Sequence, residues 1–269
     1  LRKRNRDLRL LSDCNMALVH ADDEHKLLAD VCRLCVEVGG YHMAWVGYAD
    51  HDDARTVRPV AQSGHEDGYL DEIRISWADT EIGRGPTGSA IRTGRPCVVR
   101  SVASNESMRQ WRDALIERGC RSSVALPLVC DAAILGALNI YSEEEGAFDI
   151  DEIRLLEELA SDLAYGIVTL RTRTAHAEAK ERLEFLSHFD PLTQLPNRIL
   201  LRDRFEHAAL VARNERTTIA MLYVDLDHFK QINEGFGYAV GDQVLVTVVN
   251  RLRQCLPNTA TISRLSADE

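Results

Sequence analysis

The sequence lacks any long apolar run and any secretion signal. Nowhere in its 269 residues is there a stretch of about 18 apolar residues, the length needed to span a bilayer. The chain opens on Leu1 within a charged pattern, without a basic segment followed by an apolar leader. We therefore expect a soluble chain with no membrane segment in this stretch, and the pattern at Leu1 and Glu269 suggests that both ends are cuts in a longer protein.

Basic residues are also scarce. There are 32 Lys and Arg against 42 Asp and Glu, a formal net charge of −10. A groove for a nucleic-acid polymer or a patch for an anionic membrane would need clustered basic side chains, so neither partner is expected. With 45% hydrophobic and 28% charged residues, the chain has an ordinary globular composition and a length that suits about two domains.

The seven cysteines are an odd number and are scattered through periodic segments. This usage fits a reducing compartment better than a disulfide framework, so a cytoplasmic location is expected. Cys32 and Cys35 have C-x-x-C spacing, but they lie in an amphipathic helical pattern and no second pair follows. Packing cysteines are therefore preferred over a metal or redox site.

The first 170 residues carry strand and helix patterns in an order typical of an α+β domain. An amphipathic helix over 24–38 ends at Gly39 and Gly40, and a second helix is expected over 87–92. Strand-like runs occupy 41–49, 56–63, 72–77, 97–101, 122–129 and 134–141. Six strands with helices at both ends predict an antiparallel sheet.

Three strings in this region resemble GAF domains. They are R-I-S-W-A-D-T-E-I-G-R-G-P-T-G-S-A-I-R-T-G-R-P at 74–96, S-S-V-A-L-P-L at 122–128 and G-A-L-N-I-Y-S at 136–142. The resemblance covers most of 21–170 and implies a sensor or dimerisation module, with an unknown small molecule as its ligand. It also implies a GAF-type six-stranded antiparallel sheet with flanking helices.

Two interpretations of the aromatic and methionine residues remain open. A pocket for a ligand is expected between the sheet and residues 104–117 if the following side chains gather there: Tyr41, Met43, Trp45, Met108, Trp111 and Leu115. At such spacings these residues more often fill a core, and that interpretation is preferred. His42 and His65 are preferred as core or surface residues over metal or haem ligands, because neither has a companion at ligand spacing.

A heptad pattern predicts a long helix over 150–186. Apolar and small residues alternate at steps of three and four: Ile153, Leu156, Ala160, Leu163, Ile167, Leu170, Thr174 and Ala177. Residues 1–20 predict a further helix with coiled-coil spacing, in which Leu8, Leu11, Asn15 and Leu18 have the same steps. We expect a homodimer through these helices. Packing on the chain's own sheet explains the stretch to Leu163 well, and the later positions less well.

Residues 223–245 carry the chemistry of a nucleotide site. An apolar run over 219–224 predicts a strand that delivers Asp225 and Asp227 to its end, and Lys230 and Asn233 follow in a predicted helix. Carboxylates suit a hard cation such as Mg²⁺, while a helix N-terminus and a lysine suit phosphate. The pattern therefore indicates a site for a polyphosphate and a divalent metal.

These residues resemble the first half of a GGDEF domain, the family of diguanylate cyclases that join two GTP molecules into cyclic di-GMP. Residues 190–198, D-P-L-T-Q-L-P-N-R, are similar to the family's opening D-x-L-T-G-L-x-N-R, with Gln194 in place of glycine. Ser266 follows Asp225 at the spacing where the family has the first glycine of its hairpin. A truncated α/β domain over 187–269 is implied.

The resemblance implies a role for each matching residue. Asp225, the carbonyl of Leu226 and Asp268 would hold the metal, and Asp268 with Glu269 would be catalytic, assisting deprotonation of a ribose 3′-hydroxyl. The nucleotide-binding positions implied are His228, Phe229, Lys230, Asn233 and Asp242, of which Asn233 and Asp242 would read guanine. Each such domain would bind one GTP, so that two domains must meet for catalysis.

The departures from the family pattern predict weak or absent cyclase activity. Ser266 and Ala267 replace the two hairpin glycines. A Cβ there would intrude on bound nucleotide, and would cost about 1 kcal/mol of strain at each position if φ is positive. Three functions compete: an active cyclase, a non-catalytic GTP-binding regulator of a further domain such as a phosphodiesterase, and a dimerising sensor module alone.

Overall fold

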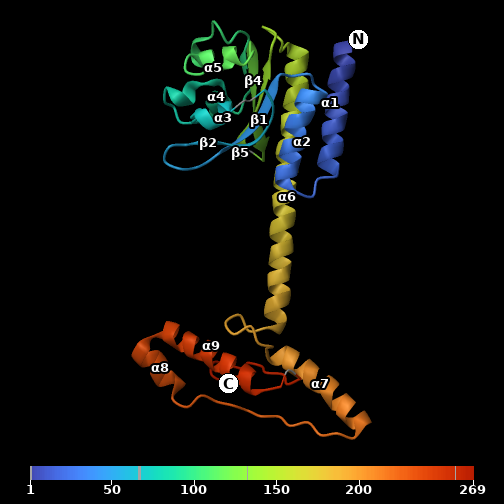
Figure 1. Ribbon diagram of the computed structural model, residues 1–269, viewed down its shortest axis with the longest axis vertical. Coiled ribbons are helices and arrows are strands. Elements are labelled where there is room, and N and C mark those ends of the chain that lie inside the picture. The colour runs from blue at the N-terminus through green and yellow to red at the C-terminus, as the bar shows by residue number, and fades with distance from the viewer. Residues whose placement is uncertain (1, 66–67, 132, 258) are drawn as a thin grey trace. The chain divides into compact units, whose positions relative to one another are not determined.

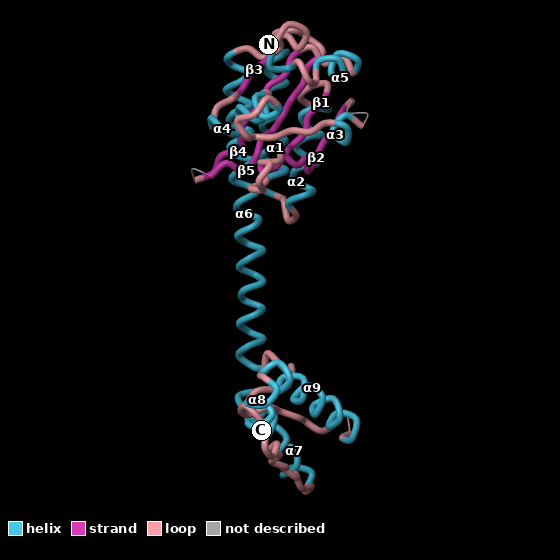
Figure 2. Tube along the Cα trace, turned by 90° about the vertical axis from the view of Figure 1, so that its left-hand side faces the viewer, coloured by secondary structure: helices cyan, strands magenta, loops and turns pink. Residues whose placement is uncertain are grey.

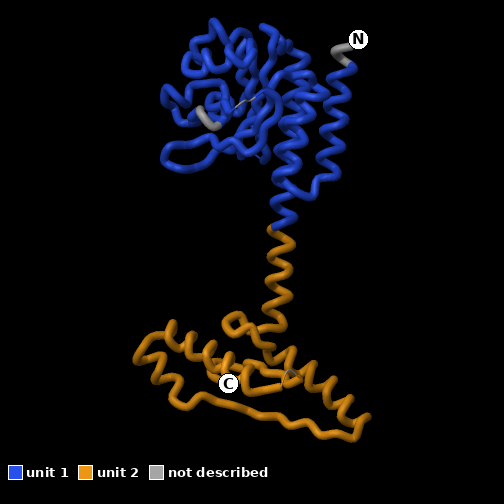
Figure 3. Tube along the Cα trace, in the orientation of Figure 1, with its two compact units in different colours: residues 1–174 blue, residues 175–269 orange. Residues whose placement is uncertain are grey.

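The computed structural model describes residues 2–65, 68–131, 133–257 and 259–269. The chain divides into two compact units, residues 1–174 and residues 175–269 (Figure 3). Helix α6 (Ile150–His188) begins in the first unit and ends in the second. No helix within the described ranges has the length and apolar character that crossing a membrane requires.

The first unit is built on a five-stranded antiparallel sheet (Figure 1, Figure 2). Its strands are β1 (Met43–Ala49), β2 (Val57–Gly64), β3 (Cys97–Val99), β4 (Ser122–Cys130) and β5 (Ala133–Ser142), in the spatial order β2-β1-β5-β4-β3. Besides α6, its helices are α1 (Arg2–Val19), α2 (Glu24–Glu37), α3 (Tyr69–Glu72), α4 (Pro86–Thr93) and α5 (Arg112–Glu117), with short 3₁₀ turns η1 (Ile82–Arg84) and η2 (Glu106–Met108).

Strand β1 shows why both faces of the sheet are apolar. Met43 and Trp45 face one core, whereas Ala44, Val46 and Tyr48 face the other. Successive side chains of a strand point to opposite faces, so a strand covered on both sides needs apolar residues throughout. Helices α2 and α6 cover one face, with α1 packed on them, and α3, α4 and α5 cover the other (Figure 1).

One of the six expected strands is missing from the described sheet. Residues 72–77 form a single antiparallel bridge, between Ser76 and Thr56, and no strand. The amide of Trp77 donates to the carbonyl of Arg55 at 2.8 Å, but Arg55 has a φ of 49°. A residue in the left-handed region cannot continue an extended ladder, so the pairing ends there.

Helix α6 uses its apolar stripe on its own unit for longer than the sequence indicated. Leu156, Leu163, Ile167 and Leu170 are all buried in the core that the helices share with the sheet. Our expectation that positions beyond Leu163 are poorly explained by the chain's own packing was wrong for Ile167 and Leu170. The reason is that α1 and α2 also pack on α6: Leu18 and Leu27 lie against the backbone at Gly166.

The part of α6 beyond this core is exposed. Residues 171–184 are all exposed, including Thr174 and Ala177, the last two positions of the heptad pattern. On α1, Leu10 and Cys14 are buried, whereas Leu8 and Asn15 are exposed. The heptad positions that remain available to a second chain are therefore few and include small or polar residues.

The second face of the sheet carries an apolar core where a ligand pocket was considered. The buried residues there include Met43, Trp45, Met108, Trp111 and Leu115. A cavity of about 10 Å³ remains beside Trp111, room for about one water molecule. The Trp111 ring lies where a side chain at position 85 would be, so glycine is required at that position. These side chains fill a core, as preferred from the sequence.

Tyr41 does not join this group and lies on the opposite face. Its hydroxyl donates to Oε1 of the buried Glu152 on α6 at 2.8 Å. Arg6 of α1 donates to the same oxygen at 3.2 Å and lies over the Tyr41 ring. This polar contact fastens α1 and α6 to the start of β1. The strand pattern could not reveal it, because Tyr41 precedes the strand.

His42 and His65 meet each other, which their sequence separation did not suggest. Their rings stack with centroids 4.4 Å apart. The His42 ring nitrogens face the Glu143 carboxylate at 2.7 Å and the Arg118 carbonyl at 2.6 Å. Parallel stacked rings do not direct their nitrogens at a common point, and no cluster of metal-binding side chains occurs in the described ranges. His42 thus packs between His65, Glu143 and Arg118.

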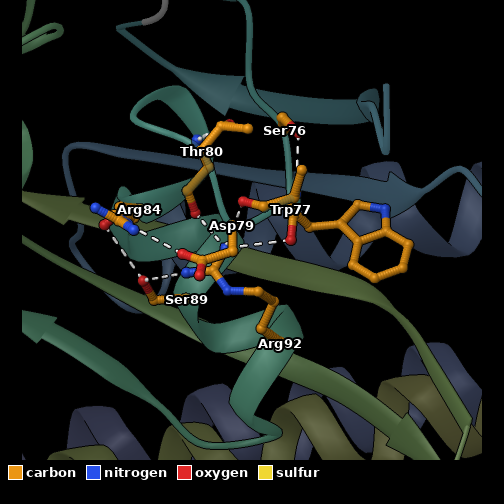
Figure 4. A network of polar contacts seen from close by, with 9 residues as sticks. Ser76, Trp77, Asp79, Thr80, Arg84, Ser89 and Arg92 are labelled. Carbon is orange, nitrogen blue, oxygen red and sulfur yellow. Dashed lines mark hydrogen bonds and ion pairs between the residues drawn. The ribbon is translucent and has the colours of Figure 1, made fainter. Parts of the chain in front are cut away.

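The string at 74–96 owes its shape to Arg92 of α4 (Figure 4). Its Nη1 donates to the carbonyl oxygens of Trp77 and Ala78, at 3.1 and 2.9 Å, and to that of Gly83. One guanidinium thus satisfies three carbonyls of an irregular loop, which has no ladder to accept from. The contact holds the loop against the N-terminal end of α4.

A second charged contact lies where α6 leaves the first unit. Arg171 donates two hydrogen bonds to the carboxylate of Glu24, both at 2.7 Å, and its guanidinium lies over the ring of Tyr48. The Tyr48 hydroxyl donates to Glu24 at 2.6 Å. The hydrogen bonds from Arg171 are the main reason that the pKa of Glu24 is lowered, against the opposing effect of burial.

The second unit is helical and irregular in the residues described. After α6 it contains α7 (Arg198–Glu215), α8 (Phe229–Phe236) and α9 (Tyr238–Cys255), and a single bridge joins Phe189 and Pro196. The strand expected over 219–224 is not formed, because no described strand lies beside it to pair with. Its apolar side chains are exposed along a pocket of about 460 Å³.

We expect Glu24→Gln to destabilise the first unit by about 1 kcal/mol at pH 7, since a partly exposed pair is screened by solvent. A lowered folded-state pKa gives stability that is present above the ordinary value of 4.5 and is lost as pH falls below it. The difference in free energy of unfolding between the variant and the wild type should therefore disappear in acid. Urea unfolding between pH 7 and pH 3 measures it. Glu158→Gln, an exposed position of α6, is the control, and a gap that persists in acid would contradict the assignment.

Candidate functional site

The turn before α8 holds the predicted phosphate-binding backbone and one predicted metal ligand, the Leu226 carbonyl, directly after Asp225. The amide of Phe229 donates to the carbonyl of Leu226 at 3.2 Å, which closes the turn at Asp227 and His228. His228 has a φ of 64°, and Asp225 before the turn is exposed. Two groups expected to meet the ligand, the Leu226 carbonyl and the Phe229 amide, are therefore bonded to each other here.

Helix α8 presents one buried and one exposed residue of the predicted site. Phe229 is buried against α9, so its side chain is a packing group, and only its backbone is near the turn. Lys230 is exposed, with its Nζ 3.6 Å from Oε1 of Glu234. An exposed pair one helical turn apart is weak, so the lysine is free to exchange this partner for a phosphate.

One predicted guanine reader, Asn233, contacts α9 at the residue before the other, Asp242. The Asn233 side chain packs against the backbone of α9 at Gly241, the residue before Asp242. Asp242 is exposed. Asn233 and Gly241, eight positions apart in the chain, are thus neighbours, because α8 and α9 join at Gly237, whose φ is 85°.

Arg264 organises the acidic segment at 264–269, although no role was predicted for it. Its Nη1 lies 3.1 Å from Oδ1 of Asp190, its Nε donates to the carbonyl of Ser266 at 3.0 Å and its Nη2 to that of Ala267 at 2.6 Å. A single guanidinium thereby fixes the bend that precedes Asp268. Its place at the start of the R-L-S-A-D-E string was the available signal.

Asp190, the first residue of the signature, is the other end of this contact. Its Oδ1 also accepts from the amide and the hydroxyl of Thr193, at 2.7 and 2.6 Å. Burial alone would raise the pKa of Asp190, but the hydrogen bonds from Thr193 and Arg264 outweigh it, and the pKa is lowered. Asp190 is therefore an anionic structural residue that joins the signature at 190–198 to the acidic segment at 264–269.

Glu269 lies beside residues that were not predicted to be near it. It accepts a hydrogen bond from the Tyr223 hydroxyl, which is the main reason that the pKa of Glu269 is lowered, and another from the Ser266 hydroxyl at 2.8 Å. Asp225 and Arg198 act electrostatically on Tyr223. Asp225 and Glu269 both raise the pKa of Tyr223, so both carboxylates act on one tyrosine.

The arrangement of the acids differs from the one expected. We predicted that a strand over 219–224 delivers Asp225 and that Asp268 shares its metal, but neither 219–224 nor 264–269 is a strand. Asp268 and Leu226 line the same pocket. In the described ranges no group of three or more His, Cys, Asp or Glu side chains could hold a metal. The expected donors, two carboxylates and a carbonyl, still have the hard oxygen chemistry that suits Mg²⁺.

The strain expected at the two replaced glycines lies elsewhere. Neither Ser266 nor Ala267 has a positive φ, so the condition for backbone strain is not met at either position. Gln194, which replaces the glycine of the signature, has a φ of 55°. The left-handed region costs a residue with a Cβ about 1–2 kcal/mol. Replacement of glycine therefore strains the backbone at Gln194 of the signature, and not at Ser266 or Ala267.

Comparison with known families identifies the two halves. Residues 21–168 match the model of the GAF domain, and residues 187–269 match the model of the diguanylate cyclase GGDEF domain. The first match covers more than half of the chain. The protein therefore belongs to the GAF domain family, and a GGDEF domain follows its GAF domain.

Relatives and solved structures agree with this division. Over 96 residues the chain is 42% identical to the bifunctional diguanylate cyclase/cyclic di-GMP phosphodiesterase MucR of Pseudomonas aeruginosa, covering 36% of this chain and 14% of MucR. It is 41% identical over 83 residues to the diguanylate cyclase TpbB of the same species, covering 31% of this chain and 19% of TpbB. The chain thus spans less than a fifth of either relative.

The GAF fold is shared with a domain from a phosphoenolpyruvate-protein phosphotransferase of Coxiella burnetii. The TM-score is 0.54 at 19% identity, and the alignment covers 63% of this chain and 97% of that domain. At this identity the similarity concerns the fold alone. The expected GAF-type antiparallel sheet is confirmed, with five described strands instead of six.

We expect Gln194→Gly to stabilise the second unit by roughly 0.5–1 kcal/mol, because relief of the left-handed strain exceeds the added entropy of the unfolded chain. Chemical unfolding followed by probes in the second unit measures the change. Ser266→Gly is the matched control, since its φ is not positive, and it should not stabilise. Equal effects of both changes would refute the strain at Gln194.

Arg264→Gln should release the segment at 264–269. Losing the charged contact with Asp190 and two carbonyl contacts should raise local hydrogen exchange about tenfold, a change of roughly 1.4 kcal/mol. Deuterium uptake in peptides covering 262–269 reports it. Arg251→Gln, at an exposed position of α9, should leave uptake there unchanged. Unchanged uptake in the Arg264 variant would show that the bend is held by other contacts.

Proposed function

We propose that this chain belongs to a protein of cyclic di-GMP signalling, in which the GAF domain is a sensor and the GGDEF domain binds GTP. The observation that carries the proposal is the match over 187–269 together with the retained acids and Lys230 around the α8 turn. Seven unpaired cysteines support a reducing, cytoplasmic setting for this activity.

In this proposal the chain's own groups bind and orient GTP. Lys230 and the backbone at His228 and Phe229 contact phosphates, while Asn233 and Asp242 read guanine. The Phe229 amide donates a hydrogen bond to the Leu226 carbonyl. For a phosphate or a metal to bind at this turn, that hydrogen bond must lengthen, or the two groups must bind the ligand while keeping it. A carbonyl has two lone pairs, so sharing is chemically available to Leu226.

Asp225, the Leu226 carbonyl and Asp268 would hold a divalent cation, Mg²⁺ by their chemistry, which would neutralise phosphate charge. Asp268 is the group proposed to help remove the proton from a ribose 3′-hydroxyl, with Glu269 next to it. Glu269 is held by Tyr223 and Ser266, and its lowered pKa favours the anionic form. It is therefore better suited to a fixed negative charge than to proton transfer.

A non-catalytic GTP-binding regulator is the second candidate, and Ser266 with Ala267 favours it. Because their backbone is unstrained, the obstacle they present is space: each adds a Cβ where the family has a hairpin of glycine next to the nucleotide. Such a chain would bind GTP and govern a further domain, for example a phosphodiesterase.

We also propose a homodimer through α1 and α6, supported by the exposed apolar residues Leu8, Met16, Val19, Tyr165 and Leu183.

Calorimetry of GTP with Mg²⁺ on the full chain, with product analysis, separates these functions. Binding without product is expected for the wild type, and product after Ser266→Gly with Ala267→Gly would show that the two side chains block the reaction. ATP is the control nucleotide. Absence of GTP binding by a folded chain would leave only the sensor module, and a monomer in sedimentation would remove the homodimer.

A further inference from the structure

Gly241 has a contact that none of the predicted roles explains. It is a buried residue of α9, and a Cβ built on it would overlap Oδ1 of Asn233 and lie 3.0 Å from its Cγ and 3.3 Å from Cζ of Phe229. The Asn233 carboxamide therefore rests directly on the α9 backbone. Only glycine leaves room for it there.

The orientation of this amide is chemically informative. Oδ1 of Asn233 is buried and has no hydrogen-bond partner among the described residues. The side-chain amide carries its NH2 group on the other branch from Cγ. The oxygen therefore faces Gly241, and the hydrogen-bond donor, the NH2 group, faces away from it. Asp242, the next residue of α9, is exposed and when ionised can only accept. The α8–α9 junction thus presents one donor and one acceptor.

We propose that Gly241 is a positioning residue that fixes the Asn233 side-chain amide so that its NH2 group can donate to a guanine base. This inference rests on the proposed function, because it assumes that Asn233 and Asp242 meet guanine. Guanine carries the matching pair, an acceptor at O6 and donors at its N1 and 2-amino groups, whereas adenine has a donor at N6. Gly241 would then determine base selectivity without touching the nucleotide.

The conformation of Gly241 makes substitution interpretable. It lies within α9 and its φ is not positive, so alanine suits the backbone and has the higher helix propensity. Harm from Gly241→Ala would therefore come from the added methyl group. Gly235 of α8 is a matched control: it is also helical, its φ is not positive, and a Cβ there meets nothing within 4 Å.

The test compares Gly241→Ala and Gly235→Ala in the full chain. First, the side-chain amide signal of Asn233 is recorded by NMR without nucleotide. Second, affinities for GTP and ATP with Mg²⁺ are measured. We expect Gly241→Ala to shift the Asn233 signal and to lower GTP affinity at least fivefold while ATP affinity stays within twofold, and Gly235→Ala to match wild type.

A double variant keeps the test decisive if Gly241→Ala alone is unstable. In an Asn233→Ala background the methyl group should be tolerated, so adding Gly241→Ala should not lower the unfolding midpoint. Equal damage in that background would place the clash at Phe229 and overturn the proposal, as would an unshifted Asn233 signal. If wild type binds no GTP, the proposed function fails, and the NMR result without nucleotide still decides the positioning role.

Discussion

The contact between Asp190 and Arg264 is the constraint on which the candidate site depends. It joins the first residue of the signature to the last segment of the chain, and the same guanidinium holds the carbonyls of Ser266 and Ala267. Asp268 and Glu269 follow that bend directly. The hydrogen bonds of Thr193 and Arg264 keep Asp190 anionic despite its partial burial, so the contact persists over the pH range in which nucleotide chemistry operates.

The GAF unit follows a different rule, in which apolar burial on both faces of one sheet decides almost everything. The core residues of β1 are distributed between the two faces, and α6 contributes its stripe as far as Leu170. Because this stripe is used within the unit, what continues toward the GGDEF domain is an exposed helical segment over 171–184. The Arg171–Glu24 pair lies at the beginning of that segment.

Much of the fold could be predicted where the pattern is local. The helix over 24–38, five of the six strands and the long helix follow from periodicity and glycine positions, and the structure forms them within a few residues. The errors occur where partners decide. Residues 72–77 form no strand, because their pairing with the neighbouring segment ends at Arg55, whose φ is positive. Residues 219–224 are apolar enough for a strand, but no described strand lies beside them. Tyr41 and His65 acquired contacts that no spacing in the sequence encodes.

The sequence by itself determined the family and the order of the two domains, because these are properties of motifs and of short-range periodicity. It also predicted which residues would carry nucleotide chemistry. Only the tertiary structure decided that Arg264 holds the hairpin segment, that Tyr223 holds Glu269, that the left-handed strain lies at Gln194, and that Asn233 rests on Gly241. Each of these joins residues distant in the chain, or is a backbone conformation set by such contacts. Local pattern carries no information about either.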